Sequence, residues 1–294
     1  MKIALIQAQA QLCKDYNTFY NKIEKLTIEA IKNGSYFHVW PEDITFWLLF
    51  TKERDSLIKF YEQTLYNEIE YEDKSLCNVL QKIQKFSKYI DLKFIGKVLK
   101  SNKIIEIYKS VFSSIAKKYN CNILAGSIYE QHLDGLFNVA HVFNNNGKII
   151  CEQRKIYPLE IESSWGVLSG KKIKYFNMGD IKIAILICND LNYKELSQEC
   201  KKNNVDLILS PSAGYVPTYL WEYNFNEYIG IVQKLRDEFC INYGRVFQCG
   251  SVNKFVKFRG MSSLSLIDGS FIYNEKALIK RETILYGEVI KCQH

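Results

Sequence analysis

The 294-residue sequence lacks the short motifs that mark metal, nucleotide and disulfide sites. Its nine cysteines include no CxxC pair and no cysteine–histidine spacing typical of zinc sites. Neither GxGxxG nor GxxxxGK occurs, so a nucleotide-binding α/β protein is poorly supported. An odd number of cysteines without a pairing pattern is typical of reduced thiols, and we therefore expect a cytoplasmic protein.

Long apolar runs, linkers and low-complexity segments are also missing. The N-terminal stretch has a brief apolar core interrupted by glutamines, and no cleavage pattern follows, so we predict no signal peptide. The apolar run from Ile44 to Phe50 is far too short to span a bilayer. Because no boundary interrupts the chain, we predict one domain covering residues 1–294.

A net charge of +7 raises the question of an anionic partner. Lysines are scattered among glutamates along most of the chain, which is typical of a solvated surface, and we predict no nucleic-acid binding. The exception is the stretch from Lys93 to Lys118, where seven lysines face one acid, Glu106. Docking of this stretch on an anionic membrane or partner stays open as the less favoured alternative.

The stretch from Ile181 to Tyr193 predicts a thiol at the end of a buried strand. Its unbroken apolar run favours a strand covered on both faces. Cys188 ends that run, polar capping residues follow, and Lys194 to Asn203 has the pattern of a short helix. A cysteine between a strand and a helix N-terminus is a candidate nucleophile, although a buried structural cysteine is the plain alternative.

The rest of the chain predicts strands interleaved with helices. Residues 2–8 and 36–40 have strand patterns on either side of a helix that begins at Asn17 and ends near Gly34. Three helical stripes follow between Leu57 and Tyr119. Later strands are expected at 122–129, 137–143, 148–154, 205–210, 245–252, 263–268 and 283–290, with loops at 156–170 and 211–214 and a helix at 218–242.

Three reactive side chains stand at the ends of predicted strands: Glu42, Lys155 and Cys188. Thiol attack on a carbonyl needs a base for the S–H proton, a donor for the oxyanion and an acid for the leaving group, and a carboxylate and an ammonium fill those roles. Taken singly, a Lys or Glu at a strand end is more often a solvated surface charge. No histidine lies in a context typical of a Cys-His dyad.

The segments around these residues resemble one family. VWPE at 39–42, RKIYP at 154–158 and LICND at 186–190 resemble, in order, three blocks of the nitrilase (carbon-nitrogen hydrolase) superfamily, and further likeness runs over 135–150, 210–213 and 260–275. The resemblance implies an α/β fold, a four-layer α-β-β-α sandwich. It also implies a homodimer or larger homo-oligomer, a small-molecule amide or related substrate, and no metal or organic cofactor.

The same resemblance implies residue roles. Cys188 would be the nucleophile and Glu42 the general base and then acid, while Lys155 and the backbone N–H of Asn189 would hold the oxyanion. Glu162, with Glu160 as the alternative, would position the substrate. The Asn-Tyr pair ending at Tyr193 is most similar to the aliphatic amidase and formamidase branches, although Asn189 departs from the aromatic or acidic residue common there. N-carbamoyl amidohydrolase, nitrilase and acyltransferase activities stay open.

The connection between Glu42 and Lys155 is much longer than is usual in this family, which predicts a helical insertion at about 51–110. Extra packing or an oligomer contact is its simplest role. We also consider a cap over the pocket, with Trp47 and its apolar neighbours Phe46, Leu48 and Phe50 as a wall that selects bulky substrates.

Overall fold

The computed structural model describes residues 1–11, 13, 15–48, 102–217, 225–251, 256–273 and 281–293. Of the expected helical insertion, residues 51–101 lie outside these ranges, and its last part belongs to helix α5 (Asn102–Lys118). No helix in the described ranges is both long and apolar enough to cross a membrane.

The first of two large sheets is built around three parallel strands. Apolar residues on both faces of β1 make it a central strand, paired in parallel with β2, which pairs in parallel with β3. Antiparallel partners complete the sheet at both edges. Its order is β15 (Thr283–Glu288), β1 (Lys2–Gln7), β2 (Phe37–Val39), β3 (Asn122–His132), β4 (Gly135–Phe143) and β5 (Ile149–Arg154).

The second large sheet repeats this plan. Its parallel centre consists of β7, β8 and β10, and the apolar run that predicted a doubly buried strand forms β7. Its order is β14 (Phe271–Tyr273), β13 (Ser263–Ser265), β10 (Asn242–Phe247), β8 (Leu207–Ser212), β7 (Ile181–Ile185) and β6 (Tyr175–Met178).

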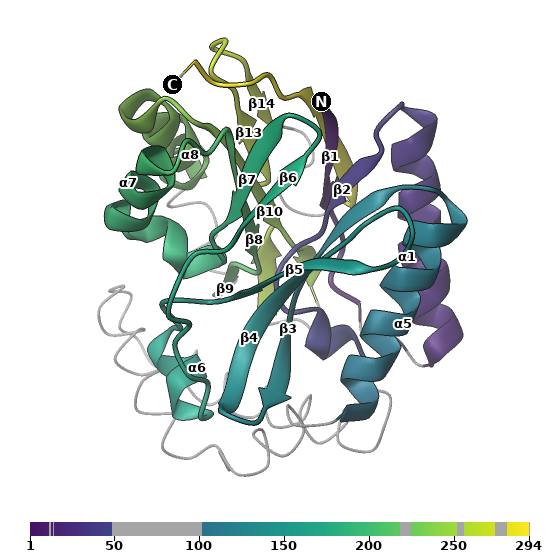
Figure 1. Ribbon diagram of the computed structural model, residues 1–294. Coiled ribbons are helices and arrows are strands. Elements are labelled where there is room, and N and C mark those ends of the chain that lie inside the picture. The colour runs from purple at the N-terminus through teal and green to yellow at the C-terminus, as the bar shows by residue number, and fades with distance from the viewer. Residues whose placement is uncertain are drawn as a thin grey trace.

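Helices cover the outer face of each sheet. Helices α1 (Tyr16–Lys32) and α5 lie on one side of the molecule, and α7 (Lys194–Lys202) and α8 (Phe225–Phe239) lie on the other (Figure 1). Alternate side chains of β7 face different layers. Ile183 and Ile185 belong to the apolar cluster between the sheets, whereas Ala184 packs with α7 and α8. The fold is therefore the expected α-β-β-α sandwich.

Several expected boundaries were wrong. The loop expected at 156–170 contains a short helix, α6 (Glu160–Ser164), and β6 was not expected. The strand expected to end at Ser210 continues to Ser212, because parallel pairing with β10 extends to that residue. The helix expected to reach Asn242 ends at Phe239, since Cys240 adopts a left-handed φ of 57° and Asn242 already pairs in β10.

The strand expected at 245–252 is divided between two sheets. Its first part lies in β10, and its second part is β11 (Cys249–Ser251). β11 belongs to a small antiparallel sheet, with β12 (Val256–Arg259) between it and β9 (Tyr215–Pro217).

Candidate active site

The segment after β2 carries Glu42 into the interior, where the residue is 2% exposed. A bulge in β3, between Leu124 and Ser127, makes room for this segment. Gly126 lies in the bulge with a φ of 70°, and a Cβ atom there would stand 1.8 Å from the carbonyl oxygen of Pro41. Only glycine allows the chain that carries Glu42 to come so close.

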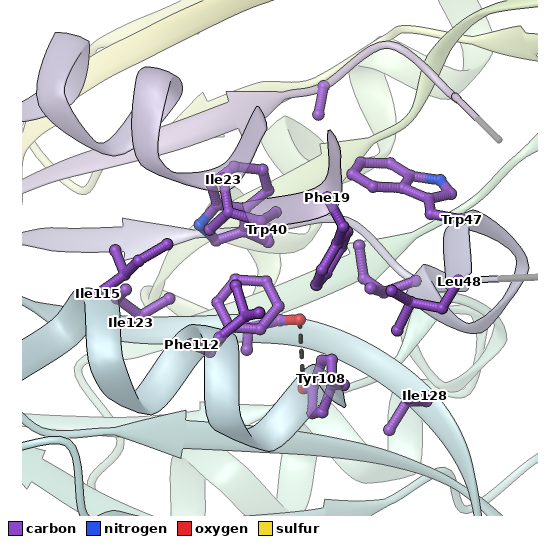
Figure 2. Packing of buried hydrophobic residues seen from close by; sticks show 14 of the residues in the cluster. Phe19, Ile23, Trp40, Trp47, Leu48, Tyr108, Phe112, Ile115, Ile123 and Ile128 are labelled. Atoms are coloured by element: carbon purple, nitrogen blue, oxygen red, sulfur yellow. Dashed lines mark hydrogen bonds between the residues drawn. The ribbon is translucent and has the colours of Figure 1, made fainter. Parts of the chain in front are cut away.

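A second set of contacts fixes the backbone of Glu42. Gln248 donates from Nε2 to the Glu42 carbonyl oxygen at 2.6 Å, and Trp47 donates from Nε1 to Oε1 of Gln248 at 2.8 Å. The structure places Trp47 and Leu48, each 1% exposed, in the apolar cluster with α1 and α5 (Figure 2). Trp47 thus supports the Glu42 segment from within the core, while Phe50 and the Phe46 side chain lie outside the description.

Lys155, which directly follows β5, joins two carboxylates. It is 1% exposed, and its Nζ donates to Glu42 Oε1 at 2.8 Å and to Glu162 Oε2 at 2.6 Å. Burial disfavours the ammonium, but the charges of Glu42 and Glu162 outweigh it and hold the pKa of Lys155 well above its ordinary value. Lys155 is therefore a fixed positive charge at Glu42.

Glu162 lies in α6 and is 3% exposed. It accepts from the Tyr129 hydroxyl at 3.1 Å and from the backbone N–H of Leu159 at 2.7 Å. Asn138 bridges both carboxylates, donating from Nδ2 to Glu42 at 3.0 Å and to Glu162 at 2.9 Å. Of the two glutamates weighed from sequence, the structure brings Glu162 to Lys155 and leaves Glu160 exposed at the helix start.

Cys188 begins a 3₁₀ turn (Cys188–Asn192) just beyond β7 and has a left-handed φ of 48°. The buried Asp190 holds this turn: it accepts from the backbone N–H groups of Ile187 at 3.0 Å, Ile156 at 3.1 Å and Tyr157 at 2.7 Å. The latter two follow Lys155 directly. Asp190 therefore ties the cysteine turn to the lysine strand.

The environment of Cys188 keeps its thiol protonated. Burial, the charge of Glu42 and a side-chain hydrogen bond to Glu42 raise the pKa of Cys188 to about 12, while Lys155 and Arg245 act in the opposite direction. A protonated thiol needs a base at the moment of attack, and Glu42 is the carboxylate that lies within hydrogen-bond reach of it.

The other two residues predicted near the site brace the turn. Asn189 donates from Nδ2 to the carbonyl oxygen of Tyr157 at 3.0 Å and accepts from Asn192 at 3.1 Å. Tyr193 stacks on Tyr157 with ring centroids 3.7 Å apart and an interplanar angle of 15°. Their side chains thus hold the cysteine turn against the chain after Lys155.

Sequence reasoning missed several residues at this site, and Asp43 is the most unusual. It has a left-handed φ of 66°, and its Oδ1 is buried without a hydrogen-bond partner. Burial, then Glu42 and Glu162, raise its pKa well above the ordinary value of 3.8. The position of Asp43 next to Glu42 was the only available signal. Asn138, Gln248 and Arg245 gave none, because their contacts join distant parts of the chain.

The described residues contain no group of three or more His, Cys, Asp or Glu side chains placed to hold a metal ion. What they bring together is a thiol, a carboxylate and a buried ammonium, with the thiol on a turn that begins in a left-handed conformation at Cys188. This combination suits acyl transfer through a thiol.

The family model for carbon-nitrogen hydrolases matches residues 2–228. The chain belongs to this family. The solved structures agree on the fold: an amidase from Nesterenkonia sp. AN1 superposes with a TM-score of 0.67 at 14% identity, covering 99% of this chain and 93% of the amidase. Nit3 of Saccharomyces cerevisiae, from branch 10 of the nitrilase superfamily, also gives 0.67, at 17% identity over 98% and 89% of the two chains.

Curated relatives match over parts of their length. The probable hydrolase YhcX of Bacillus subtilis is 26% identical over 215 residues, which are 72% of this chain and 34% of the relative. The omega-amidase NIT2 of Danio rerio is 30% identical over 111 residues, 35% of this chain and 40% of the relative. This chain thus spans well under two thirds of the length of these relatives.

Proposed function

We propose that this carbon-nitrogen hydrolase is an amidase that converts an amide to an acid and ammonia or an amine through a thioester on Cys188. The observation that carries the proposal is the buried link from Cys188 through Glu42 to Lys155 and Glu162. It supplies one base, one nucleophile and one fixed cation, and Glu42 contacts both of the others.

In the first half of the reaction, Glu42 takes the thiol proton as the sulfur of Cys188 attacks the amide carbonyl. The ammonium of Lys155 and the backbone N–H of Asn189 hold the negative oxygen that forms. Glu42 then gives its proton to the leaving nitrogen, the C–N bond breaks, and the acyl group stays on sulfur.

In the second half, Glu42 takes a proton from a water molecule as the oxygen of that water attacks the thioester carbonyl. The carbon–sulfur bond breaks, the proton returns to Cys188, and the acid leaves. One amide and one water thus give one acid and one ammonia or amine. Since Glu162 holds Lys155 from the other side, its role in this scheme is to keep the ammonium directed at the carbonyl oxygen.

The test is ammonia release from a panel of amides, nitriles and N-carbamoyl compounds. We expect release from amides by the wild-type protein, and a loss of about 10⁴-fold or more in Cys188→Ala, because the nucleophile is gone. Cys240→Ala is the matched control, since this free cysteine is exposed, and it should keep full activity. Equal activity of Cys188→Ala would exclude the thioester route, and release from nitriles or N-carbamoyl compounds alone would exclude an amidase.

Docking on an anionic membrane through the basic stretch loses two of the lysines in its described part to ion pairs. Lys118 pairs with Glu24 of α1 at 2.8 Å, and Lys109 pairs with Glu130 of β3 at 2.6 Å. These lysines are already neutralised by carboxylates of the same chain. Lys93 to Lys100 lie outside the described residues.

A further inference from the structure

Tyr129 places a buried hydroxyl group between two carboxyl groups. It lies in β3 and is 2% exposed, and its ring packs edge-on against Trp165 with the ring centroids 6.0 Å apart. Its hydroxyl donates to Oε1 of Glu162 at 3.1 Å, and a side-chain hydrogen bond also joins it to Asp43. The proposed reaction gives a role to Glu162 but none to Tyr129 or Asp43.

Of the two carboxyl groups, Glu162 is the better acceptor for the hydroxyl hydrogen. Its oxygens accept from four donors: the Tyr129 hydroxyl, the Asn138 amide, the Lys155 ammonium and the backbone N–H of Leu159. Such a set, with an ammonium at 2.6 Å, is typical of an ionised carboxylate. Asp43 differs, because its Oδ1 is buried and has no hydrogen-bond partner within the described part of the chain.

The hydroxyl of Tyr129 has a single hydrogen to donate. Because that hydrogen is directed at Glu162, the bond between Tyr129 and Asp43 has to take its hydrogen from Asp43. A protonated Asp43 then donates to the hydroxyl oxygen, and the hydroxyl donates to Glu162. A neutral carboxyl group also suits the unpartnered Oδ1, since a buried oxygen without a partner is far more costly on an ion.

The charges that face Asp43 favour the same proton. Glu42 from the segment after β2 and Glu162 from α6 are negative, Lys155 after β5 is positive, and Tyr129 of β3 supplies the hydrogen bond. Burial and the two glutamates outweigh the ammonium and the hydrogen bond, so the pKa of Asp43 is raised. An ionised Asp43 would be a third negative charge beside an ammonium that already contacts two carboxylates.

Loss of this proton would disturb the cation of the site. An ionised Asp43 would compete with Glu162 for the one hydrogen of Tyr129, and Glu162 would lose a donor on Oε1. The other oxygen of Glu162 holds the Lys155 ammonium at 2.6 Å. A shift of about 1 Å in a group that positions the reacting atoms can cost as much as about 100-fold in rate.

We propose that Asp43 and Tyr129 are positioning residues: protonated Asp43 donates to Tyr129, Tyr129 donates to Glu162, and this chain of hydrogen bonds holds Glu162 against Lys155. The proton stays on Asp43 throughout, and neither residue touches the substrate. The inference rests on the proposed function for its effect on turnover, but not for the proton on Asp43. Its rival is that the two side chains only fill space beside the site.

The first experiment measures kcat and KM for an amide from about pH 5 to about pH 9. Asp43→Asn carries an N–H donor at every pH, so its kcat should rise about tenfold relative to wild type across this range. Asp43→Leu has no donor and should have a kcat about tenfold below that of Asp43→Asn, with less change in KM. A constant ratio of Asp43→Asn to wild type, or equal kcat in the two variants, overturns the proposal, because filled space does not depend on pH.

Tyr129→Phe breaks the chain at its centre and should lower kcat about tenfold. In this background Asp43→Asn should no longer change the pH profile, since its donor has lost its acceptor. The matched control is Tyr119→Phe, which removes a hydroxyl that donates to Glu24 at 2.8 Å beside α1 and should keep the wild-type kcat. A wild-type kcat in Tyr129→Phe overturns the proposal.

A second measurement needs no substrate. At about pH 5, above the ordinary pKa of 3.8, the infrared difference between wild type and Asp43→Asn should contain the C=O stretch of a protonated carboxyl group. The band should shift in Tyr129→Phe, and its absence from wild type overturns the proposal. A band that shifts, with no ammonia release from any amide, would reject the amidase and keep the hydrogen-bond chain, whereas ammonia release without the band would do the reverse.

Discussion

At the scale of single residues, the site contains buried charges of opposite sign that stabilise one another. Glu42 and Glu162 are both almost fully buried, and Lys155 is the cation that both of them contact. A buried carboxylate is costly without a partner. The same ammonium that is expected to hold the oxyanion therefore also makes this part of the core stable.

Replacing Lys155 with Met should consequently cost both activity and stability. Two buried carboxylates would lose their cation, and we expect the free energy of unfolding to fall by about 3–5 kcal/mol. Urea unfolding at neutral pH measures this, and Lys117→Met, on the surface of α5, is the control that should change little. A loss below about 1 kcal/mol would mean that the carboxylates are protonated or solvated, against the account.

The raised pKa of Asp43 makes the free energy of unfolding depend on pH. Its pKa in the folded protein is raised by burial, Glu42 and Glu162, so the folded state holds this proton more tightly than the unfolded chain does. The stability linked to this proton is present below pH 3.8 and is lost as the pH rises toward the folded pKa. Asp43→Asn has no such proton, so its stability relative to wild type should increase between pH 4 and pH 7. Urea unfolding of both proteins across this range checks the trend, which a constant difference would refute.

At the scale of elements, the bulge of β3 and the end of β2 form one unit. The bulge exists because Gly126 adopts a left-handed conformation under Pro41, and the Glu42 side chain is delivered one residue later. The position of the base thus depends on a backbone contact between strands that lie far apart in sequence.

Gly126→Ala should displace the Glu42 segment. The new methyl group would meet the Pro41 carbonyl at 1.8 Å, so activity should fall together with stability. Gly179→Ala is the matched control: its φ of 63° imposes the same strain, of about 1–2 kcal/mol, but nothing lies within 4 Å of the new Cβ. Thermal unfolding and amide turnover of both variants separate strain from displacement. Equal losses in the two would show that the close approach does not matter.

At the scale of the whole molecule, the sequence predicted what depends on local pattern and on the three family blocks. The run at Ile183–Ile187 indicated a strand buried on both sides, and the ends of strands indicated Glu42, Lys155 and Cys188. The contacts that hold these residues in place could not be predicted from the sequence. Trp47 and Gln248 are 201 positions apart, and Ala213 and Glu42 are 171 positions apart. Such pairs are decided by sheet order, which no local pattern contains.

The residues of the site come from both sheets. Glu42 and Lys155 follow strands of the first sheet, and Cys188 follows a strand of the second, so the acyl-enzyme of the proposed reaction forms where the two sheets meet. In the proposed reaction, every substrate with the same acyl group passes through the same thioester, whatever its leaving group.

The most direct test of a common thioester on Cys188 is to measure how that intermediate divides between water and hydroxylamine. An amide and an ester with the same acyl group would each be turned over in the presence of hydroxylamine, and the ratio of acid to hydroxamate measured. The account predicts the same ratio from both substrates, because both leaving groups have departed before the choice is made. Ratios that differ with the leaving group would contradict a common thioester on Cys188.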